Sequence, residues 1–227
     1  MYNKFFGFTL AEVLITMGII GVVAVLTIAV IVPKFKEYTY VHQFKVAYSV
    51  LQNAYTKIQS EDGDFQGYSS AEELYEKFLP QLKVVEKCFK TEGCFPNITY
   101  DTLSNHSKYV NFYSSLCPKL RLANGILVAF GNRELYVDTN GDKGPNKLGI
   151  DMFHFRFQTV KPTLILGYGS ENWMWESGFT YCDISCKTAF EMHPGASCTW
   201  WVIKTGNMDY LHRKISVSEW RKYFKRN

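Results

Sequence analysis

The chain of 227 residues lacks the sequence patterns that carry most enzyme chemistry. No glycine-rich loop joins a predicted strand to a predicted helix, so a phosphate-binding loop of the usual kind is missing. No motif pairs a nucleophile with a base, and the five histidines are scattered along the chain. They are His42, His106, His154, His193 and His212. An enzyme is therefore the least favoured class.

The net charge is also small. The net charge is +4, and removal of the first seven residues with Lys4 would leave 4 − 1 = +3, which is too small to imply a nucleic-acid partner by itself. No charged residue occurs between Val13 and Val32, a run of twenty residues. A helix of this length crosses a hydrocarbon core of about 30 Å. The apolar region of a cleaved secretory signal is shorter and ends at a small-residue site. The run therefore predicts a membrane-spanning helix.

The residues Gly7-Phe8-Thr9-Leu10-Ala11-Glu12 stand directly before this run. Their order resembles the junction of the prepilin family, which comprises type IV pilins and the pilin-like subunits of type II secretion and DNA-uptake machines. The resemblance implies that prepilin peptidase cuts between Gly7 and Phe8 and that Phe8 becomes N-methylated. It covers roughly residues 7–55, and beyond them it concerns the architecture alone. Pro33 departs from the family, whose helices often carry a proline nearer the middle of this stretch.

Glu12 lies at the edge of the apolar span, where an unpaired carboxylate is costly. A free amine on Phe8 of a neighbouring subunit would neutralise it, because opposite charges attract strongly at low dielectric. Such a pair would set the axial offset between packed helices, so Glu12 is the predicted assembly residue. In the alternative interpretation Glu12 marks the cytoplasmic end of a signal anchor and reaches for the lipid headgroups.

The resemblance implies a structural subunit of a type IV pilus or a type II secretion pseudopilus, which is not an enzyme. Its implied partners are other pilin-like subunits in a homo- or hetero-polymer, prepilin peptidase and an inner-membrane assembly platform. Its implied location is the bacterial inner membrane, as a single-pass protein with an extracytoplasmic globular domain that is extracted on assembly. The alternative is a monomeric, signal-anchored envelope protein whose exported domain binds a ligand.

The helical pattern continues beyond the apolar run. Apolar residues recur three and four positions apart, as on one face of a helix. They are Val41, Phe44, Tyr48, Leu51, Tyr55 and Ile58. Proline at position 33 can kink a long helix without ending it, so we expect one helix from Phe8 to about Gln59. The predicted divisions are a leader at 1–7, a membrane and polymerisation helix at 8–33, an amphipathic half of the same helix at 34–60, and a globular domain at 61–227.

The globular part reads as helix followed by strands. Ser70 and Glu73 form a capping-box pattern at the start of a helix that Pro80 bends or ends. The segment between Gly63 and Asn124 otherwise reads as loops. Strands are predicted from Gly125 onward at residues 126–130, 135–137, 152–157, 163–167 and 199–203, with a hairpin at 131–133. The fold class is therefore α+β and pilin-like, with the long N-terminal helix packed on a C-terminal antiparallel sheet.

All six cysteines lie beyond the membrane run. They are Cys88, Cys94, Cys117, Cys182, Cys186 and Cys198. An even count in an exported domain predicts three disulfides, with fifteen ways to pair them. Cys88 and Cys94 bracket a short loop and are the best local pair, whereas the pairing of the others stays open. The competing prediction is a zinc site of Cys182, Cys186, His193 and Cys198, whose spacing matches no common zinc finger closely.

One acidic loop is a candidate calcium site. Asp138, Asn140 and Asp142 alternate as oxygen ligands do in calcium loops, and Asp151 follows. The match to an EF-hand is incomplete, because Lys143 replaces the required glycine. The loop also resembles the calcium-binding loops of some secretion pseudopilins. The alternative is a connection whose aspartates form Asx-turns. No cofactor is required, and calcium is the candidate ion.

Three other features lead to predictions. The C-terminal tail at 213–226 mixes basic and aromatic residues, and Ser216 with Glu219 can cap a short helix there. Such a tail suits DNA or an anionic membrane, although a solvated helix docked by its aromatics is the commoner case. His154 alternates with phenylalanines and is expected on the exposed face of a strand. The tryptophans at 173, 175, 200 and 201 are expected in the core and in strands.

Overall fold

A computed structural model describes residues 7–62, 70–104, 108–157, 165–167, 195, 198–216, 218–219 and 222. The chain divides into two compact units, Met1–Thr39 and Tyr40–Asn227. Each unit is described by itself below. The first unit consists of the junction and the apolar part of the long helix, and the second contains the sheet.

Helix α1 spans Leu10–Asp62 and contains Pro33 without a break. One continuous helix was predicted, and the structure confirms it. Within the second unit, the face of α1 that carries the predicted apolar stripe is buried. The buried residues are Val41, Phe44, Ala47, Leu51, Ala54, Tyr55 and Ile58. Tyr48, the one other member of the predicted stripe, is half-buried against the same core.

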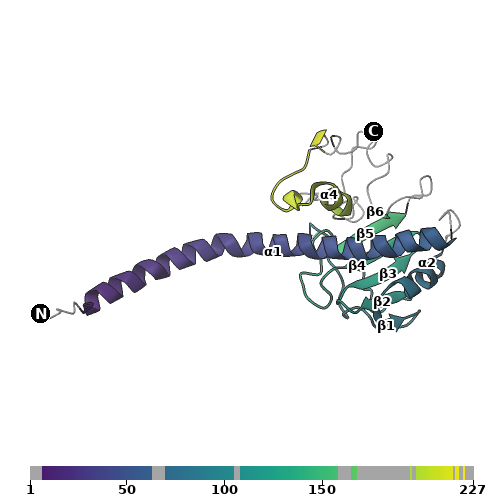
Figure 1. Cartoon of the computed structure of the whole chain (residues 1–227), viewed down its shortest axis with the longest axis horizontal. Helices are drawn as coiled ribbons and strands as arrows, with labels where there is room; N and C mark the ends of the chain where they lie inside the picture. Colours follow the sequence, from purple (N-terminus) through teal and green to yellow (C-terminus); the bar gives the residue numbers. More distant parts are fainter. Residues whose placement is uncertain are drawn as a thin grey trace, which may run out of the picture. The chain divides into compact units, whose positions relative to one another are not determined.

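Six strands follow one another in the chain and in space, so the sheet is an antiparallel meander ordered β1-β2-β3-β4-β5-β6 (Figure 1). Their bounds are β1 Val84–Cys88, β2 Lys119–Leu122, β3 Leu127–Gly131, β4 Glu134–Asp138, β5 Met152–Phe157 and β6 Ile165–Gly167. Gly131 pairs with Glu134, which leaves a two-residue turn and confirms the predicted hairpin. The α+β, pilin-like arrangement expected from the sequence is therefore present.

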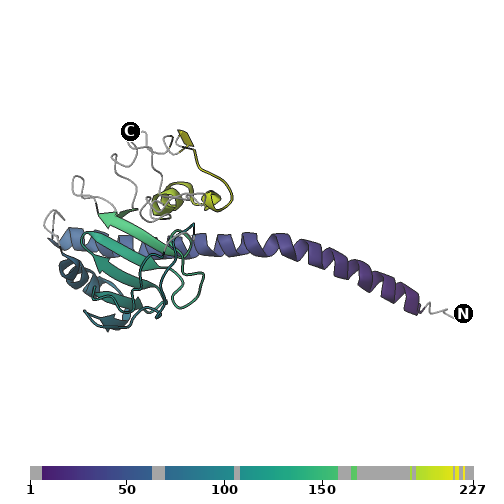
Figure 2. The same cartoon turned by 180° about the vertical axis from the view of Figure 1, so that it is seen from behind.

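One face of the sheet is covered by helices. Side chains from alternate positions of β3, β4 and β5 join the buried face of α1 in one apolar core. The ring of Phe44 on α1 lies 4.5 Å from that of Phe153 on β5, in an edge-to-face arrangement. Helix α2, Ala71–Phe78, covers the same face next to α1 (Figures 1 and 2). Ser70 caps α2 by accepting a hydrogen bond from the Glu73 amide, as the capping box predicts. After α2 the chain continues in the 3-10 helix η2, Leu79–Gln81, which contains Pro80.

The opposite face of the sheet is covered by the described parts of the segment between β1 and β2, residues 89–104 and 108–118. Phe95, Tyr100 and Phe112 of this segment form a second apolar cluster with Leu127 and Met152 of the sheet. The segment is fixed by Lys119, whose buried ammonium donates to the carbonyl oxygens of residues 112, 113 and 115 at 2.8, 3.0 and 2.8 Å. The sheet therefore lies in the middle of three layers.

Some predictions for the second unit were wrong. The strand expected at 199–203 is helix α4, Cys198–Thr205. All residues from Cys198 to Val202 are buried there, and a continuous apolar run fits either a strand or a buried helix. The expectation that strands begin at Gly125 missed β1 and β2. β1 is irregular at Val84–Glu86, and β2 alternates basic and apolar residues over four positions only, which is too short to stand out as a strand. A further 3-10 helix, η3, spans Asp209–Leu211.

His154 was expected on an exposed face, and this too was wrong, since only 5% of it is exposed. Its ring stacks on Tyr136 with centroids 4.4 Å apart, and its Nε2 lies 3.1 Å from Glu134 Oε2. It does alternate with Phe153 and Phe155, but the second face of the sheet is covered as well. Trp200 and Trp201 are buried as expected, although on a helix, while the tryptophans at 173 and 175 lie outside the described residues.

Candidate functional site

The candidate site is the junction at residues 7–12, where the non-helical N-terminal residues meet α1. Thr9 stands immediately before the helix and Glu12 lies in its first turn. The Thr9 hydroxyl accepts a hydrogen bond from the Glu12 amide at 3.3 Å. In return, Glu12 Oε2 accepts from the Thr9 amide at 2.8 Å and from the Thr9 hydroxyl at 2.9 Å. This is a reciprocal capping box, and it explains why α1 begins where it does.

The capping box leaves part of the Glu12 carboxylate open. Both hydrogen bonds from Thr9 go to Oε2, and Oε1 accepts none within the described part of the chain. Glu12 is exposed, and so is Phe8, at 87%. The carboxylate can therefore cap its own helix with one oxygen and receive a further positive group with the other.

Gly7 makes no contact that would explain a glycine at this position. A Cβ added there would meet nothing within 4 Å, and its φ lies outside the range that favours glycine. Within the part of the chain that the structure describes, no contact and no backbone angle requires glycine at residue 7.

Beyond the junction, α1 is apolar and unburied. It is long and apolar enough to cross a membrane, and none of its most apolar window is buried within the protein. The hydroxyls of Thr16 and Thr27 donate to backbone carbonyls of the preceding turn, at 3.0 Å to Val13 and 2.9 Å to Val23. These polar groups are thus satisfied within the helix, as a hydrocarbon surrounding requires. The helix is consistent with a membrane anchor.

Comparison with known proteins identifies the junction. Residues 2–28 match the family model described as the prokaryotic N-terminal methylation motif. The chain carries this methylation motif. It is therefore consistent with a type IV pilin-like or pseudopilin-like protein, as the sequence predicted from the same residues. No curated protein and no solved structure matches the chain.

One feature of the junction, the capping box between Thr9 and Glu12, was not predicted from the sequence. Glu12 was assigned a partner on a neighbouring subunit, but its partner within the chain, Thr9, was not recognised. The signal was present, because threonine followed three residues later by glutamate before an apolar run is a capping-box pattern.

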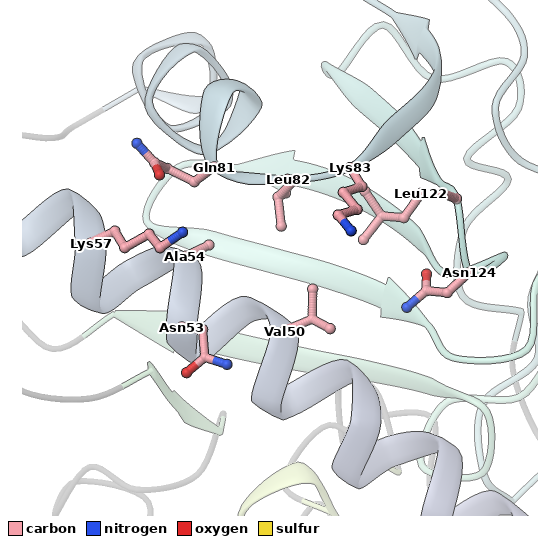
Figure 3. A pocket seen from close by; sticks show the side chains of 10 residues that line it. Val50, Asn53, Ala54, Lys57, Gln81, Leu82, Lys83, Leu122 and Asn124 are labelled. Atoms are coloured by element: carbon pink, nitrogen blue, oxygen red, sulfur yellow. The ribbon is translucent and has the colours of Figure 1, made fainter.

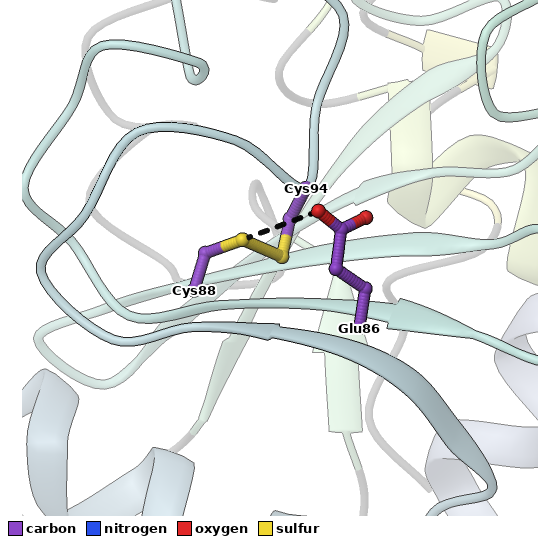
Figure 4. A group of neighbouring side chains, drawn as sticks. All are labelled: Glu86, Cys88 and Cys94. Atoms are coloured by element: carbon purple, nitrogen blue, oxygen red, sulfur yellow. Dashed lines mark hydrogen bonds between the residues drawn. A yellow bond between two sulfur atoms is a disulfide. The ribbon is translucent and has the colours of Figure 1, made fainter.

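The predicted disulfide between Cys88 and Cys94 is present, with a Cα–Cα distance of 5.9 Å (Figure 4). Both cysteines are buried, and Glu86 Oε1 lies 3.8 Å from Cys88 Sγ. In the part of the chain that the structure describes, Glu86, Cys88 and Cys94 are the one group of three His, Cys, Asp or Glu side chains close enough to share a metal ion. Because two of the three are joined in the disulfide, the group is not available as a thiolate site.

The expectation of three disulfides was wrong at Cys117, which carries a free thiol. Its sulfur lies 2.9 Å from the hydroxyl of Ser115. Of the other described cysteines, Cys88 and Cys94 are bonded to each other. Cys198 is disulfide-bonded, and this removes one thiolate from the competing zinc prediction. The other members of that set, Cys182, Cys186 and His193, lie outside the described residues.

The acidic loop places two buried carboxylates close together. Asp138 Oδ1 accepts from the amides of Asn140 and Gly141, at 3.0 and 2.9 Å, and its Oδ2 accepts from the hydroxyl of Tyr100. Asp151 accepts from the backbone amides of residues 146 and 147 at 2.8 and 2.7 Å. Asn140 connects the two carboxylates, because its backbone amide donates to Asp138 and its side-chain nitrogen Nδ2 donates to Asp151 Oδ2 at 3.3 Å. The Asx-turn interpretation is thus supported at Asp138.

The pKa values of both carboxyl groups are raised. Burial, followed by the charge of Asp151, raises the pKa of Asp138 to about 7. Burial likewise raises the pKa of Asp151. The pKa of Tyr100 is also raised, first by burial and then by the charge of Asp138. A bound cation would relieve the repulsion between the two aspartates.

The predicted calcium ligands are only partly brought together. The side-chain oxygens of Asn140 and Asn146 are buried without a hydrogen-bond partner, so the loop offers orphaned acceptors beside two carboxylates. An all-oxygen set of this kind fits calcium. Asp142 does not join it, because Arg121 binds both of its oxygens at 3.0 Å. Calcium binding stays a prediction, which now concerns Asp138, Asn140 and Asp151, with Asn146 as a residue that the sequence did not single out.

The C-terminal tail is described only in part. Ser216 and Glu219 form the predicted capping box, with the Glu219 amide donating to the Ser216 hydroxyl at 3.2 Å. Arg213, one of its basic residues, is paired with Glu219 at 2.8 Å and with Asp209 at 3.2 Å. This arginine is partly neutralised, so it adds little to a surface for DNA. Contact of the tail with DNA stays a prediction.

Proposed function

We propose that the chain is a structural, non-enzymatic subunit of a type IV pilus or type II secretion pseudopilus. Prepilin peptidase removes residues 1–7 and methylates the amine of Phe8. The mature chain is held in the bacterial inner membrane by α1, with the second unit on the extracytoplasmic side, until an assembly platform moves it into the filament. The match of residues 2–28 to the methylation motif carries this proposal. It is supported by the exposure of the junction and by the unburied apolar helix behind it.

Processing is tested at Gly7. Gly7→Ala adds a methyl group that meets nothing within 4 Å, so it leaves the fold of the chain unchanged. We expect this variant to accumulate as an unprocessed precursor in the membrane, because the peptidase is the molecule that needs glycine there. Intact-mass spectrometry of protein purified from the native membrane measures the outcome.

Gly18→Ala is the matched control, since a methyl group at Gly18 also meets nothing within 4 Å. It should be processed like the wild type. Native protein that still carries residues 1–7 would overturn the proposal.

Assembly is tested at Glu12 with two substitutions that separate its roles. Glu12→Ala removes both the cap on α1 and the negative charge, whereas Glu12→Gln keeps a side chain that can complete a capping box. In our proposal the charge pairs with the amine of Phe8 on a neighbouring subunit. Both variants should therefore be exported and processed but enter filaments poorly. Quantitative immunoblotting of sheared filaments against whole cells measures incorporation.

The second candidate function is a monomeric, signal-anchored envelope protein whose exported domain binds a ligand. It is favoured by a cleft in the second unit, lined by α1, the residues that lead into β1 and the turn between β2 and β3. It requires no neighbouring amine, so Glu12 would be dispensable. If Glu12→Gln entered filaments normally while Glu12→Ala did not, Glu12 would act by capping alone. That result would reject the charge pair.

A further inference from the structure

The second unit contains a cleft of about 370 Å³ that the proposed filament role does not use. It lies between the second half of α1, the residues that lead from η2 into β1, and the turn between β2 and β3 (Figure 3). Apolar side chains contribute to its lining from three directions. These are Val50 and Ala54 on α1, Leu82 before β1, and Leu122 at the end of β2. Its volume falls in the range of about 300–1,000 Å³ that is usual for small-molecule sites.

The charge of the lining is one-sided. Lys57 and Lys83 contribute to it from opposite walls, and none of the lining residues is acidic (Figure 3). Neither ammonium group has an ion-pair or hydrogen-bond partner within the described part of the chain. Glu61 is not a lining residue, and its carboxylate accepts from the side-chain amide of Gln81, which is one, at 3.1 Å. Two unpaired positive charges therefore border an apolar surface.

We propose that this cleft binds a small organic anion with an apolar body. The body would lie on Val50, Ala54, Leu82 and Leu122, and its carboxylate, or a similar anionic group, would lie between Lys57 and Lys83. Charge-assisted hydrogen bonds are about twice as strong as neutral ones, and the apolar surroundings of the cleft strengthen them further. Such a ligand satisfies the lysines and covers the apolar residues at the same time. A neutral apolar ligand would cover the apolar residues without pairing the lysines. A cation would be repelled by the lysines.

The test uses the processed, full-length chain in lipid nanodiscs, with empty nanodiscs to correct for partition of the probe into lipid. The probe is 4-(trifluoromethyl)phenylacetate, observed by fluorine NMR, and its neutral primary amide is compared with it. We expect saturable binding of the carboxylate at millimolar concentration or below and clearly weaker binding of the amide. Lys57→Gln and Lys83→Gln should each weaken binding of the carboxylate about tenfold, with little effect on the amide.

Two further variants keep the result interpretable. Lys87→Gln removes an exposed charge on β1 outside the cleft and should leave binding unchanged. Ala123→Trp places a large ring at the exposed rim of the cleft and should abolish binding of both probes. Thermal unfolding followed by circular dichroism shows whether each variant is folded.

Several results would overturn the proposal. They are absence of saturable binding, equal binding of acid and amide, and wild-type affinity in the lysine variants or in Ala123→Trp. A second copy of the chain is the competing occupant. It would be revealed if Asn53→Cys, at the edge of the cleft, formed cross-links to a second copy that the probe did not displace. That result would assign the cleft to self-association instead.

Discussion

Thr9 and Glu12 satisfy each other at the start of α1, where the Glu12 carboxylate accepts from both the amide and the hydroxyl of Thr9, at 2.8 and 2.9 Å. The carboxylate thus has a role within the subunit before any neighbour approaches. Because the box uses one oxygen, a neighbour's amine can bind without first breaking it. In the proposed assembly, Thr9 would hold Glu12 in one orientation and act as a positioning residue.

Thr9 is therefore expected to influence assembly through its hydroxyl. Thr9→Val keeps the shape of the side chain and the backbone amide but removes the hydroxyl from the capping box. We expect it to be processed at the wild-type rate and to enter filaments less well. Thr9→Ser restores the hydroxyl and should restore incorporation. If Thr9→Val assembled as well as Thr9→Ser, the box would be irrelevant to assembly.

We expect Asp138 to make the stability of the folded chain depend on pH. Its pKa is raised from 3.8 to about 7 in the folded chain, chiefly by burial. Between about pH 4 and pH 7 the unfolded chain loses this proton while the folded chain keeps it. Through this group the free energy of unfolding is therefore highest at low pH, falls across that window, and is level above it. At about 1.4 kcal/mol per pKa unit, the loss through Asp138 is on the order of 4–5 kcal/mol.

Urea unfolding of the full chain in detergent, repeated from pH 4 to pH 8, measures this slope. Asp138→Asn removes the larger contribution and should make the slope shallower, although Asp151, whose pKa is also raised by burial, keeps part of it. Asp142→Asn is the control, because Asp142 is exposed and bound to Arg121. An unchanged slope in Asp138→Asn would show that other groups cause the pH dependence.

Calcium is predicted to stabilise the same loop. Asp138 and Asp151 repel each other, and a cation bound to their oxygens would replace that repulsion with attraction. We expect the unfolding temperature to rise when calcium replaces chelator, and to rise more at pH 8 than at pH 5. Asp151→Asn should abolish the effect, whereas Asp142→Asn should keep it. If Asp142→Asn alone abolished it, the ion would sit at the outer part of the loop.

How much of this molecule could be read from its sequence depends on how local each signal is. The junction, the long helix, the cap at Ser70, the hairpin at 131–133 and the Cys88–Cys94 bridge are set by residues a few positions apart. The burial of Lys119 and His154 could not be predicted from the sequence. Both side chains are polar, and they are buried because the segment between β1 and β2 folds over the sheet. In α4, the β-branched and aromatic composition favoured a strand, and packing against β5 and β6 decided otherwise.

Lys119 is expected to be one of the most sensitive positions of the second unit. Its ammonium is buried and holds three backbone carbonyls of the segment that covers the sheet. Lys119→Met keeps the apolar stem and leaves those acceptors without a donor. At about 1–3 kcal/mol for each unsatisfied group, the loss of stability should be about 3 kcal/mol or more. Lys87→Met, on the exposed part of β1, should change the urea midpoint little. Equal midpoints for the two variants would mean that water replaces the ammonium.

The described cysteines differ in whether they carry a free thiol. Cys88 and Cys94 are bonded to each other and Cys198 is disulfide-bonded, whereas Cys117 is free and half-buried. Alkylation of envelope-purified protein without reduction should therefore label Cys117 and leave the other three unlabelled, as peptide mapping can show.

The same difference should appear in stability. Replacing both Cys88 and Cys94 by alanine opens a loop with a sequence separation of 6. In the chain-entropy model this costs roughly 2 kcal/mol, because the unfolded chain gains freedom. Cys117→Ala removes no bridge and should leave the urea midpoint unchanged. If the double variant unfolded at the wild-type midpoint, or if Cys117 resisted alkylation until reduction, this assignment of the thiols would be rejected.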